Sequence, residues 1–165
     1  MVLGMGFMSV TNLLKQSGEF HVPVDPLSVA SHLNIEVYET DFTLEDGENV
    51  SGIVAVEDGQ PVIYVSTRDP HVRKRFTIAH EIGHVYLGHL ADKENNELID
   101  DEVRLRSATW NLEEKEANEF AARLLMPASL IRGAIDRGRV SIEELAEFFD
   151  VSEQAMMYRL KNLGY

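Results

Sequence analysis

Apolar residues recur at helical spacing in two short segments near the start of the chain and at strand spacing in three runs after them. The spacing predicts a first helix over residues 9–18 that ends at Gly18, and a second short helix that begins at the Asp25-Pro26 turn. The three strand-like runs cover residues 35–39, 51–56 and 61–66. We therefore expect a small sheet to follow two short helices.

The last two strand-like runs are separated by Asp58-Gly59, which is a strong hairpin signal. The hairpin predicts an antiparallel sheet. Pro61 has no backbone N–H, so it favours either an edge strand or the start of a strand for the third run. An exposed edge strand can accept an added peptide, although most edge strands bind nothing.

Helical spacing returns from about residue 69 and predicts a central helix that ends at Gly88. Residues 92–119 are rich in charge, and we expect a solvated loop over the first part of this stretch. Further helices are predicted over 112–126 and 128–136, with Pro127 opening the second of them. Two more helix starts follow, at Ser141 and Ser152.

Composition narrows the possible functions. The chain has 165 residues with 15 Lys and Arg against 28 Asp and Glu, a formal charge of -13, so it repels polyanions such as nucleic acids. It contains no cysteine, which excludes disulfides, thiol chemistry and Cys-based metal sites. No apolar run reaches the roughly 18 residues that span a bilayer. The first ten residues do not resemble a secretory signal, so we expect a cytoplasmic protein.

The segment His80-Glu81-Ile82-Gly83-His84 carries the main candidate chemistry. Residues four apart share a helix face, so His80 and His84 can direct ring nitrogens to one zinc ion. Glu81 can then act as a general base that takes a proton from water activated by the metal. A coincidental pair of histidines on a helix is the alternative.

A catalytic zinc needs a third protein ligand. The metzincin arrangement is excluded, because Leu87 and Leu90 stand where that pattern needs Gly and His. A glutamate from a following helix is the other common solution. The predicted helix over 112–126 offers four of them, Glu113, Glu114, Glu116 and Glu119.

Two strings in the chain resemble one family of proteins. RFTIAHEIGHVYLGHL followed by EKEANEFAARLLMP is similar to the ImmA/IrrE family of zinc metallopeptidases. The resemblance implies an α+β, zincin-like fold in which a small antiparallel sheet accompanies the HExxH helix. It also implies one Zn²⁺ per chain, held by His80, His84 and Glu116, with Glu81 as the catalytic base. The implied reaction is hydrolysis of a protein substrate, either a helix-turn-helix transcriptional repressor or an antitoxin.

The C-terminal segment resembles a helix-turn-helix unit, which raises an alternative function. We expect a metallopeptidase domain over residues 1–138 and a helix-turn-helix-like unit over 139–165 packed on it. The alternative is a DNA-binding or protein-docking transcriptional regulator in which the metal site is structural. Residues 141–165 hold five acidic and two basic side chains, however, so direct DNA binding is disfavoured.

Several polar residues near the two strings have both a functional and a structural interpretation. His89 could support a metal ligand or could simply end the helix, and Asn118 could orient a ligand or bond the backbone. Tyr86 could stabilise an intermediate, although packing is the commoner role. Four basic residues precede the metal helix, and ordinary surface charge is the better interpretation for them. They are Arg68, Arg73, Lys74 and Arg75.

Overall fold

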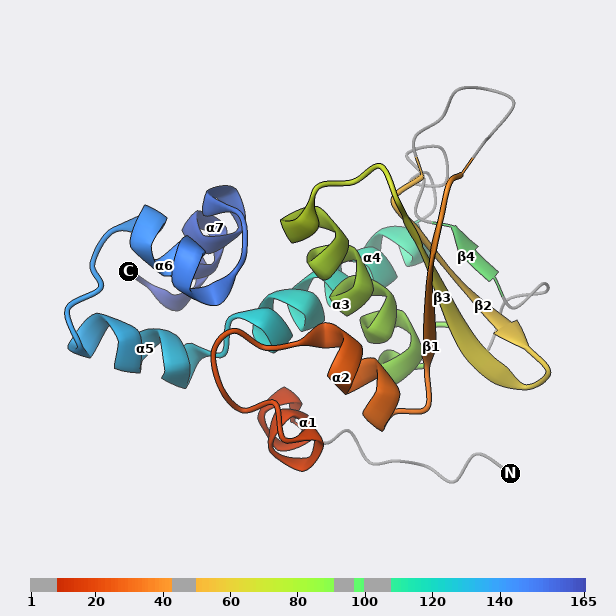
Figure 1. Cartoon of the computed structure of the whole chain (residues 1–165), viewed down its shortest axis with the longest axis horizontal. Helices are drawn as coiled ribbons and strands as arrows, with labels where there is room; N and C mark the ends of the chain where they lie inside the picture. The colour runs from red at the N-terminus through yellow and green to blue at the C-terminus, as the bar shows by residue number, and fades with distance from the viewer. Residues whose placement is uncertain (1–8, 43–49, 91–96, 100–107) are drawn as a thin grey trace.

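The computed structural model describes residues 9–42, 50–90, 97–99 and 108–165, which form an α+β fold as expected. The described elements are α1 (Val10–Ser17), α2 (Pro26–His32), β1 (Glu36–Thr40), β2 (Gly52–Glu57), β3 (Gln60–Ser66), α3 (His71–Leu87), β4 (Glu97–Ile99), α4 (Ala108–Leu125), α5 (Ala128–Asp136), α6 (Ile142–Phe149) and α7 (Glu153–Leu163). Figure 1 shows the strands at one end of the molecule, α3 and α4 at its centre, and α5–α7 at the other end. Within the described ranges, no helix is both long and apolar enough to cross a membrane.

The sheet is mixed rather than antiparallel, which corrects the expectation from the sequence. Its strand order is β1-β3-β2-β4. β2 and β3 form the predicted antiparallel hairpin around Asp58 and Gly59, both of which have positive φ. β1 lies on the other side of β3 and runs parallel to it, whereas the β2–β3 and β2–β4 pairs are antiparallel.

The third strand-like run is central in the sheet and is not an edge strand. β3 pairs with β1 on one side and with β2 on the other. Pro61 is tolerated because it stands at the start of the strand, which was the other interpretation of this residue. β4 forms the edge of the sheet opposite β1 and pairs antiparallel with β2. This short strand lies within the stretch that the sequence predicts to be a loop.

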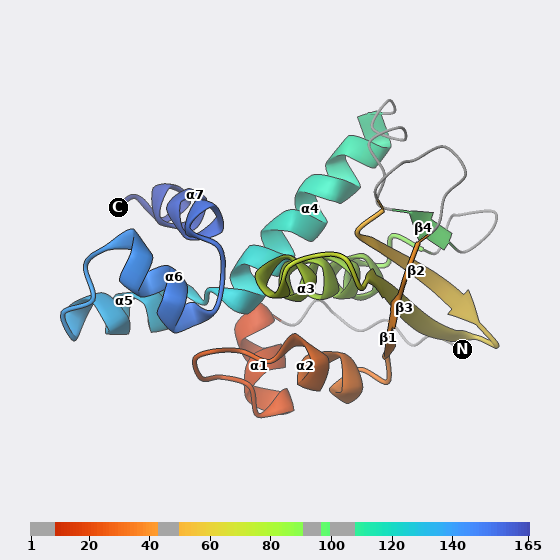
Figure 2. The same ribbon diagram turned by 45° about the horizontal axis from the view of Figure 1, so that its top comes forward.

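The helices pack around α3, which contacts β2 and β3 of the sheet as well as α4 and α2. Figure 2 shows α3 between α4 on one side and α2 on the other. Buried apolar residues of sheet and helices form one core that continues into the C-terminal helices. Its fully buried members include Ile63, Ile82, Leu124, Ile131 and Phe149. The central position of α3 places the His80–His84 segment inside the protein.

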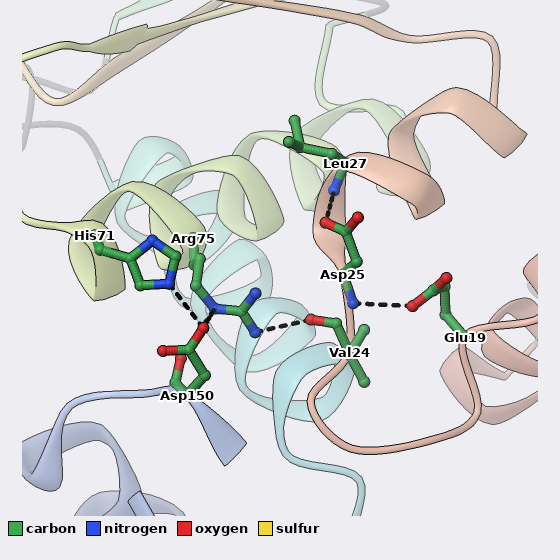
Figure 3. Close-up of polar contacts among 7 residues, drawn as sticks. All are labelled: Glu19, Val24, Asp25, Leu27, His71, Arg75 and Asp150. Carbon is green, nitrogen blue, oxygen red and sulfur yellow. Dashed lines mark hydrogen bonds and ion pairs between the residues drawn. The ribbon is translucent and has the colours of Figure 1, made fainter. Parts of the chain in front are cut away.

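Arg75 of α3 ties the N-terminal and C-terminal segments to the central helix (Figure 3). Its guanidinium donates to the backbone carbonyl of Val24 at 2.7 Å and to that of Asp150 at 2.9 Å. It also lies 3.1 Å from the Asp150 carboxylate, which His71 contacts at 2.7 Å. Arg75 is therefore a structural clamp and not the ordinary surface charge expected from the sequence.

Asp150 ends α6 in the left-handed conformation, with φ of 54°. After this turn α7 returns to the residue that follows α4, where Arg159 donates from Nε to the carbonyl of Met126 at 3.0 Å. The Arg159 side chain is only 6% exposed. One of the two basic residues of the C-terminal segment is thus used inside the protein.

Candidate metal centre

His80 and His84 lie one turn apart on α3, and both face α4. Their Nε2 atoms are 3.1 Å apart, and both residues are buried. The helix continues without interruption to Gly88, whose left-handed conformation ends it. The regular helix thus produces the paired imidazoles that the spacing predicts.

Glu114 of α4 completes a cluster with the two histidines. One carboxylate oxygen is 3.1 Å from His80 Nε2, and the other is 2.9 Å from His84 Nε2. Among the residues that the structure describes, His80, His84 and Glu114 form a group that could hold a metal ion. Two imidazoles and one carboxylate are a donor set typical of zinc sites that keep a position for substrate.

Glu116, the ligand implied by the family resemblance, does not join this cluster. Its carboxylate contacts His89 Nε2 at 3.0 Å, and its side chain is 51% exposed. Glu119 also lies elsewhere, since it forms an ion pair with Arg123 at 2.7 Å. Of the four glutamates that the sequence offers, the structure brings Glu114 to the two histidines.

Close packing of α3 against α4 determines which glutamate reaches the histidines. A side chain added at Gly83 would have its Cβ 3.2 Å from Ala117 Cα and 3.1 Å from a ring carbon of Phe120. Ala117 therefore marks the line of α4 that touches α3. Glu114 stands three residues before it and so lies on the same face of α4, whereas Glu116 does not.

The second ring nitrogens of both histidines have polar partners. His80 Nδ1 lies 3.0 Å from Asn118 Oδ1, a carbonyl oxygen that can only accept, so His80 donates from Nδ1. His89 Nε2 lies 3.0 Å from the Glu116 carboxylate and donates to it, and in a neutral imidazole this leaves Nδ1 as an acceptor. His84 Nδ1 lies 2.9 Å from that atom and therefore donates to it. These contacts favour the tautomers of His80 and His84 that carry the proton on Nδ1.

These tautomers provide a test of whether the cluster suits a metal. With protons on the Nδ1 atoms, the Nε2 lone pairs of His80 and His84 face the oxygens of Glu114. Lone pairs at such distances repel one another unless a proton or a metal ion lies between them, and a metal ion can take the place of such protons. Metal-binding histidines commonly donate their other N–H to a carboxylate, carbonyl or similar acceptor, as both do here. The residues present therefore fit a bound cation.

The protonation states of the cluster also favour metal binding. Burial lowers the pKa of the His84 imidazole, and Glu114 only partly opposes this effect. Burial raises the pKa of the Glu114 carboxyl, but hydrogen bonds and charge from His80 and His84 outweigh it and lower that pKa to about 2. Glu114 is thus ionised at neutral pH, the state in which a carboxylate binds metals.

Glu81 is buried between α3 and the sheet. A Cβ at Gly52 of β2 would lie 2.9 Å from a Glu81 carboxylate oxygen and 2.5 Å from Cγ2 of Thr77. The strand backbone can therefore approach the Glu81 side chain only because residue 52 is glycine. This contact places Glu81 beside the start of β2, one residue along the helix from His80.

The supporting residues were only partly foreseen. Asn118 and His89 contact Nδ1 of His80 and of His84, contacts that fit the ligand-orienting interpretation, one of the two that the sequence offers. Tyr86 packs on Phe120, with ring centroids 5.3 Å apart. The sequence does not indicate that Gly52 is needed for the close contact with Glu81, because a glycine within a strand has several common explanations.

Comparison with known proteins identifies the family of the chain. The family described as the IrrE N-terminal-like domain, which is classified among the peptidases, matches residues 30–161. The chain belongs to this family. The match confirms the resemblance seen in the two strings, and its range includes α3, α4 and the candidate metal centre between them.

A solved structure shares the fold. A Mycobacterium tuberculosis transcriptional regulator is similar with a TM-score of 0.67 and 18% sequence identity. The similarity covers 96% of this chain but only 46% of the regulator, so the chain spans less than half of that protein's length. No match was found among curated proteins.

Proposed function

We propose that the protein is a zinc-dependent endopeptidase that hydrolyses peptide bonds of a protein substrate. His80, His84 and Glu114 hold the metal, and Glu81 is the catalytic base. The observation that carries this proposal is the convergence of two Nε2 atoms and one buried carboxylate beside Glu81. Membership in a peptidase family supports the same reaction class.

The residues of the site have distinct roles in this reaction. When bound, zinc supplies a Lewis acid that polarises the scissile carbonyl and activates water. Glu81 accepts the proton that the attacking water loses and then delivers it to the leaving amine. Asn118 and His89 keep the Nε2 atoms of the ligand histidines directed at the metal. The tight contact with Gly52 restricts the Glu81 carboxylate to the side of the helix that faces β2.

The substrate class comes from the family resemblance. We propose a cytoplasmic protein substrate, either a helix-turn-helix transcriptional repressor or an antitoxin. A repressor or antitoxin encoded beside this protein is the first candidate to test.

The test combines metal analysis with one substitution. The purified protein is expected to contain about one zinc per chain and to cleave the candidate repressor or antitoxin. Glu81→Gln keeps the shape of the side chain but removes the base, so this variant should retain zinc, fold and substrate binding while losing cleavage. Full activity of Glu81→Gln would exclude the proposed role of Glu81. If the protein does not retain added zinc, the proposed zinc-dependent peptidase activity is excluded.

A transcriptional regulator with a structural metal site is the second candidate. The regulator of similar fold and the helix-turn-helix-like pair α6–α7 favour it. Burial of Arg159 weighs against it, because α7 then offers Lys161 as its remaining basic side chain. Binding of duplex DNA by zinc-loaded Glu81→Gln, without any cleavage by the wild type, would favour the regulator.

A further inference from the structure

A groove of about 680 Å³ lies between α3, α4 and α7. Phe76 of α3, Asn118 of α4 and Tyr158 of α7 are among the residues that line it, and we call it the α7 groove. Apolar side chains form much of its surface, and Tyr158 is 56% exposed at its α7 wall. α7 is held in place here by the bond from Arg159 to Met126.

The α7 groove begins next to the candidate metal centre. Asn118, which lines it, lies 3.0 Å from His80 Nδ1. The ring of Phe76, which also lines it, has its centroid 6.4 Å from that of His80. A polypeptide lying in the groove would therefore approach a metal-ligand histidine from the side of α7.

The charge of the groove differs in sign from that of the whole protein. Arg73 and Lys115 line it, and in the described part of the chain neither forms an ion pair with a carboxylate. Arg73 donates to the hydroxyl of Ser51 instead. The carboxylate that lines the groove, Glu119, pairs with Arg123 and lies 3.7 Å from Arg159. The groove thus presents two uncompensated cations on a protein with a formal charge of -13.

We propose that the α7 groove binds a segment of the substrate protein in which apolar side chains are accompanied by Asp or Glu. Arg73 and Lys115 select the acidic residues, and Tyr158 contacts the apolar ones. This inference rests on the proposed peptidase function and assigns the helix-turn-helix-like unit a role in substrate selection. A peptide is favoured over nucleic acid because two cations on an acidic protein cannot hold a long polyanion against the overall repulsion.

The test measures peptide binding by zinc-loaded full-length Glu81→Gln, which separates recognition from cleavage. The probes are fluorescein-labelled peptides in matched pairs with identical apolar residues, one member carrying two Glu and the other two Lys. We expect the Glu member to bind about tenfold more tightly, with a preference that declines as salt is added. The double variant Arg73→Glu/Lys115→Glu should reverse the preference. Tyr158→Ala should weaken both members of each pair.

The control is Arg132→Glu/Lys161→Glu, which changes the net charge equally at two exposed residues outside the groove. This variant should keep the preference for Glu peptides. The inference is overturned if neither peptide binds, if no preference exists, or if the control and groove variants behave alike. It is also overturned if a labelled single-stranded oligonucleotide binds the groove more tightly than the Glu peptides.

Cleavage of the same peptides by zinc-loaded wild type distinguishes this inference from the proposed function. Cleavage without any preference for acidic residues would leave the peptidase standing and exclude the role of the α7 groove. A preference that depends on Arg73 and Lys115, without cleavage of the peptides or of the candidate substrate, would support the groove and exclude the peptidase.

Discussion

Gly83 of α3 and Ala117 of α4 are in backbone contact, with an ideal Cβ on Gly83 only 3.2 Å from Ala117 Cα and 3.3 Å from its carbonyl oxygen. The two helices can approach this closely because residue 83 has no side chain. The contact also holds the histidines of α3 opposite Glu114. Helix spacing and the metal cluster are thus coupled through one pair of small residues.

The first prediction concerns Gly83→Ala. The added methyl group must push α4 away, because two of its three nearest atoms are backbone atoms of Ala117. We expect overpacking of about 1–3 kcal/mol to exceed the 0.5–1 kcal/mol that alanine contributes within a helix. Zinc affinity should fall as well, since Glu114 moves with α4. Urea unfolding of the apoprotein and chelator competition measure the two effects.

Gly133→Ala on α5 is the matched control for this substitution. Its new Cβ would meet only the end of the flexible Arg137 side chain, at 3.3 Å. The variant should be stabilised by about 0.5–1 kcal/mol and should bind zinc normally. Equal behaviour of the two alanine variants would contradict the proposed coupling.

The sequence could predict the helix that carries the two histidines. It could not predict which face of the partner helix α4 is turned towards them. Periodicity, the i, i+4 histidines and Gly88 are local signals, so α3 and its paired imidazoles follow from them. Which glutamate of α4 faces them depends on the contact between Gly83 and Ala117, which is a property of two helices together. Glu116 was therefore expected where Glu114 lies.

The sequence could predict strand pairing only where a local turn signal joins the two strands. The β2–β3 hairpin has a local turn signal at Asp58-Gly59, and it forms as predicted. The neighbours β1 and β4 join from segments distant in the sequence, and neither their order nor their direction is encoded in a turn. The sequence accordingly predicts an antiparallel sheet, and it leaves open whether Pro61 marks an edge strand or the start of a strand.

The second prediction assigns the third ligand. Glu114→Ala should weaken zinc binding by at least about 100-fold, because it removes a buried carboxylate that contacts both histidines. Glu116→Ala should have a smaller effect, because Glu116 acts only through His89. Chelator titration of both variants beside Glu113→Ala decides the matter. Zinc loss in Glu116→Ala with retention in Glu114→Ala would restore the ligand set implied by the family resemblance.

The third prediction concerns His89, which orients His84 without reaching the cluster itself. His89→Ala removes the acceptor for His84 Nδ1, so the imidazole can rotate or change tautomer. We expect zinc to bind about 10–100-fold more weakly, with the unfolding transition of the apoprotein changed much less. His32→Ala, at an exposed position, is the control. Unchanged zinc affinity in His89→Ala would exclude the orienting role.

The fourth prediction compares two arginines of the basic cluster, Arg75 within α3 and Arg68 just before it. The Arg75 side chain is 11% exposed and bonds both Val24 and Asp150, so Arg75→Ala should destabilise the protein by about 2–3 kcal/mol. Arg68 is 63% exposed and pairs with an exposed Asp41, so Arg68→Ala should cost about 0–1 kcal/mol. Urea unfolding measures both. Equal effects would show that Arg75 does not join the three segments.

The last prediction concerns the pH dependence of α6. Hydrogen bonds from the backbone and side chain of Ser141, and from the Val140 backbone, hold the pKa of the Glu144 carboxyl below its ordinary value. Because the folded pKa lies below the unfolded one, the charged cap stabilises the fold fully above the ordinary glutamate pKa. That contribution is lost as the pH falls through the folded pKa.

Glu144→Gln tests this sign, since glutamine can still accept the bonds but does not titrate. The wild type should exceed this variant in stability by a constant amount near neutral pH, and the difference should shrink as the solution becomes acidic. Urea unfolding across that range measures the difference, and carboxyl NMR of Glu144 follows the titration directly. A stability difference that grows on acidification would mean that the folded pKa is raised, contrary to the capping geometry at Ser141.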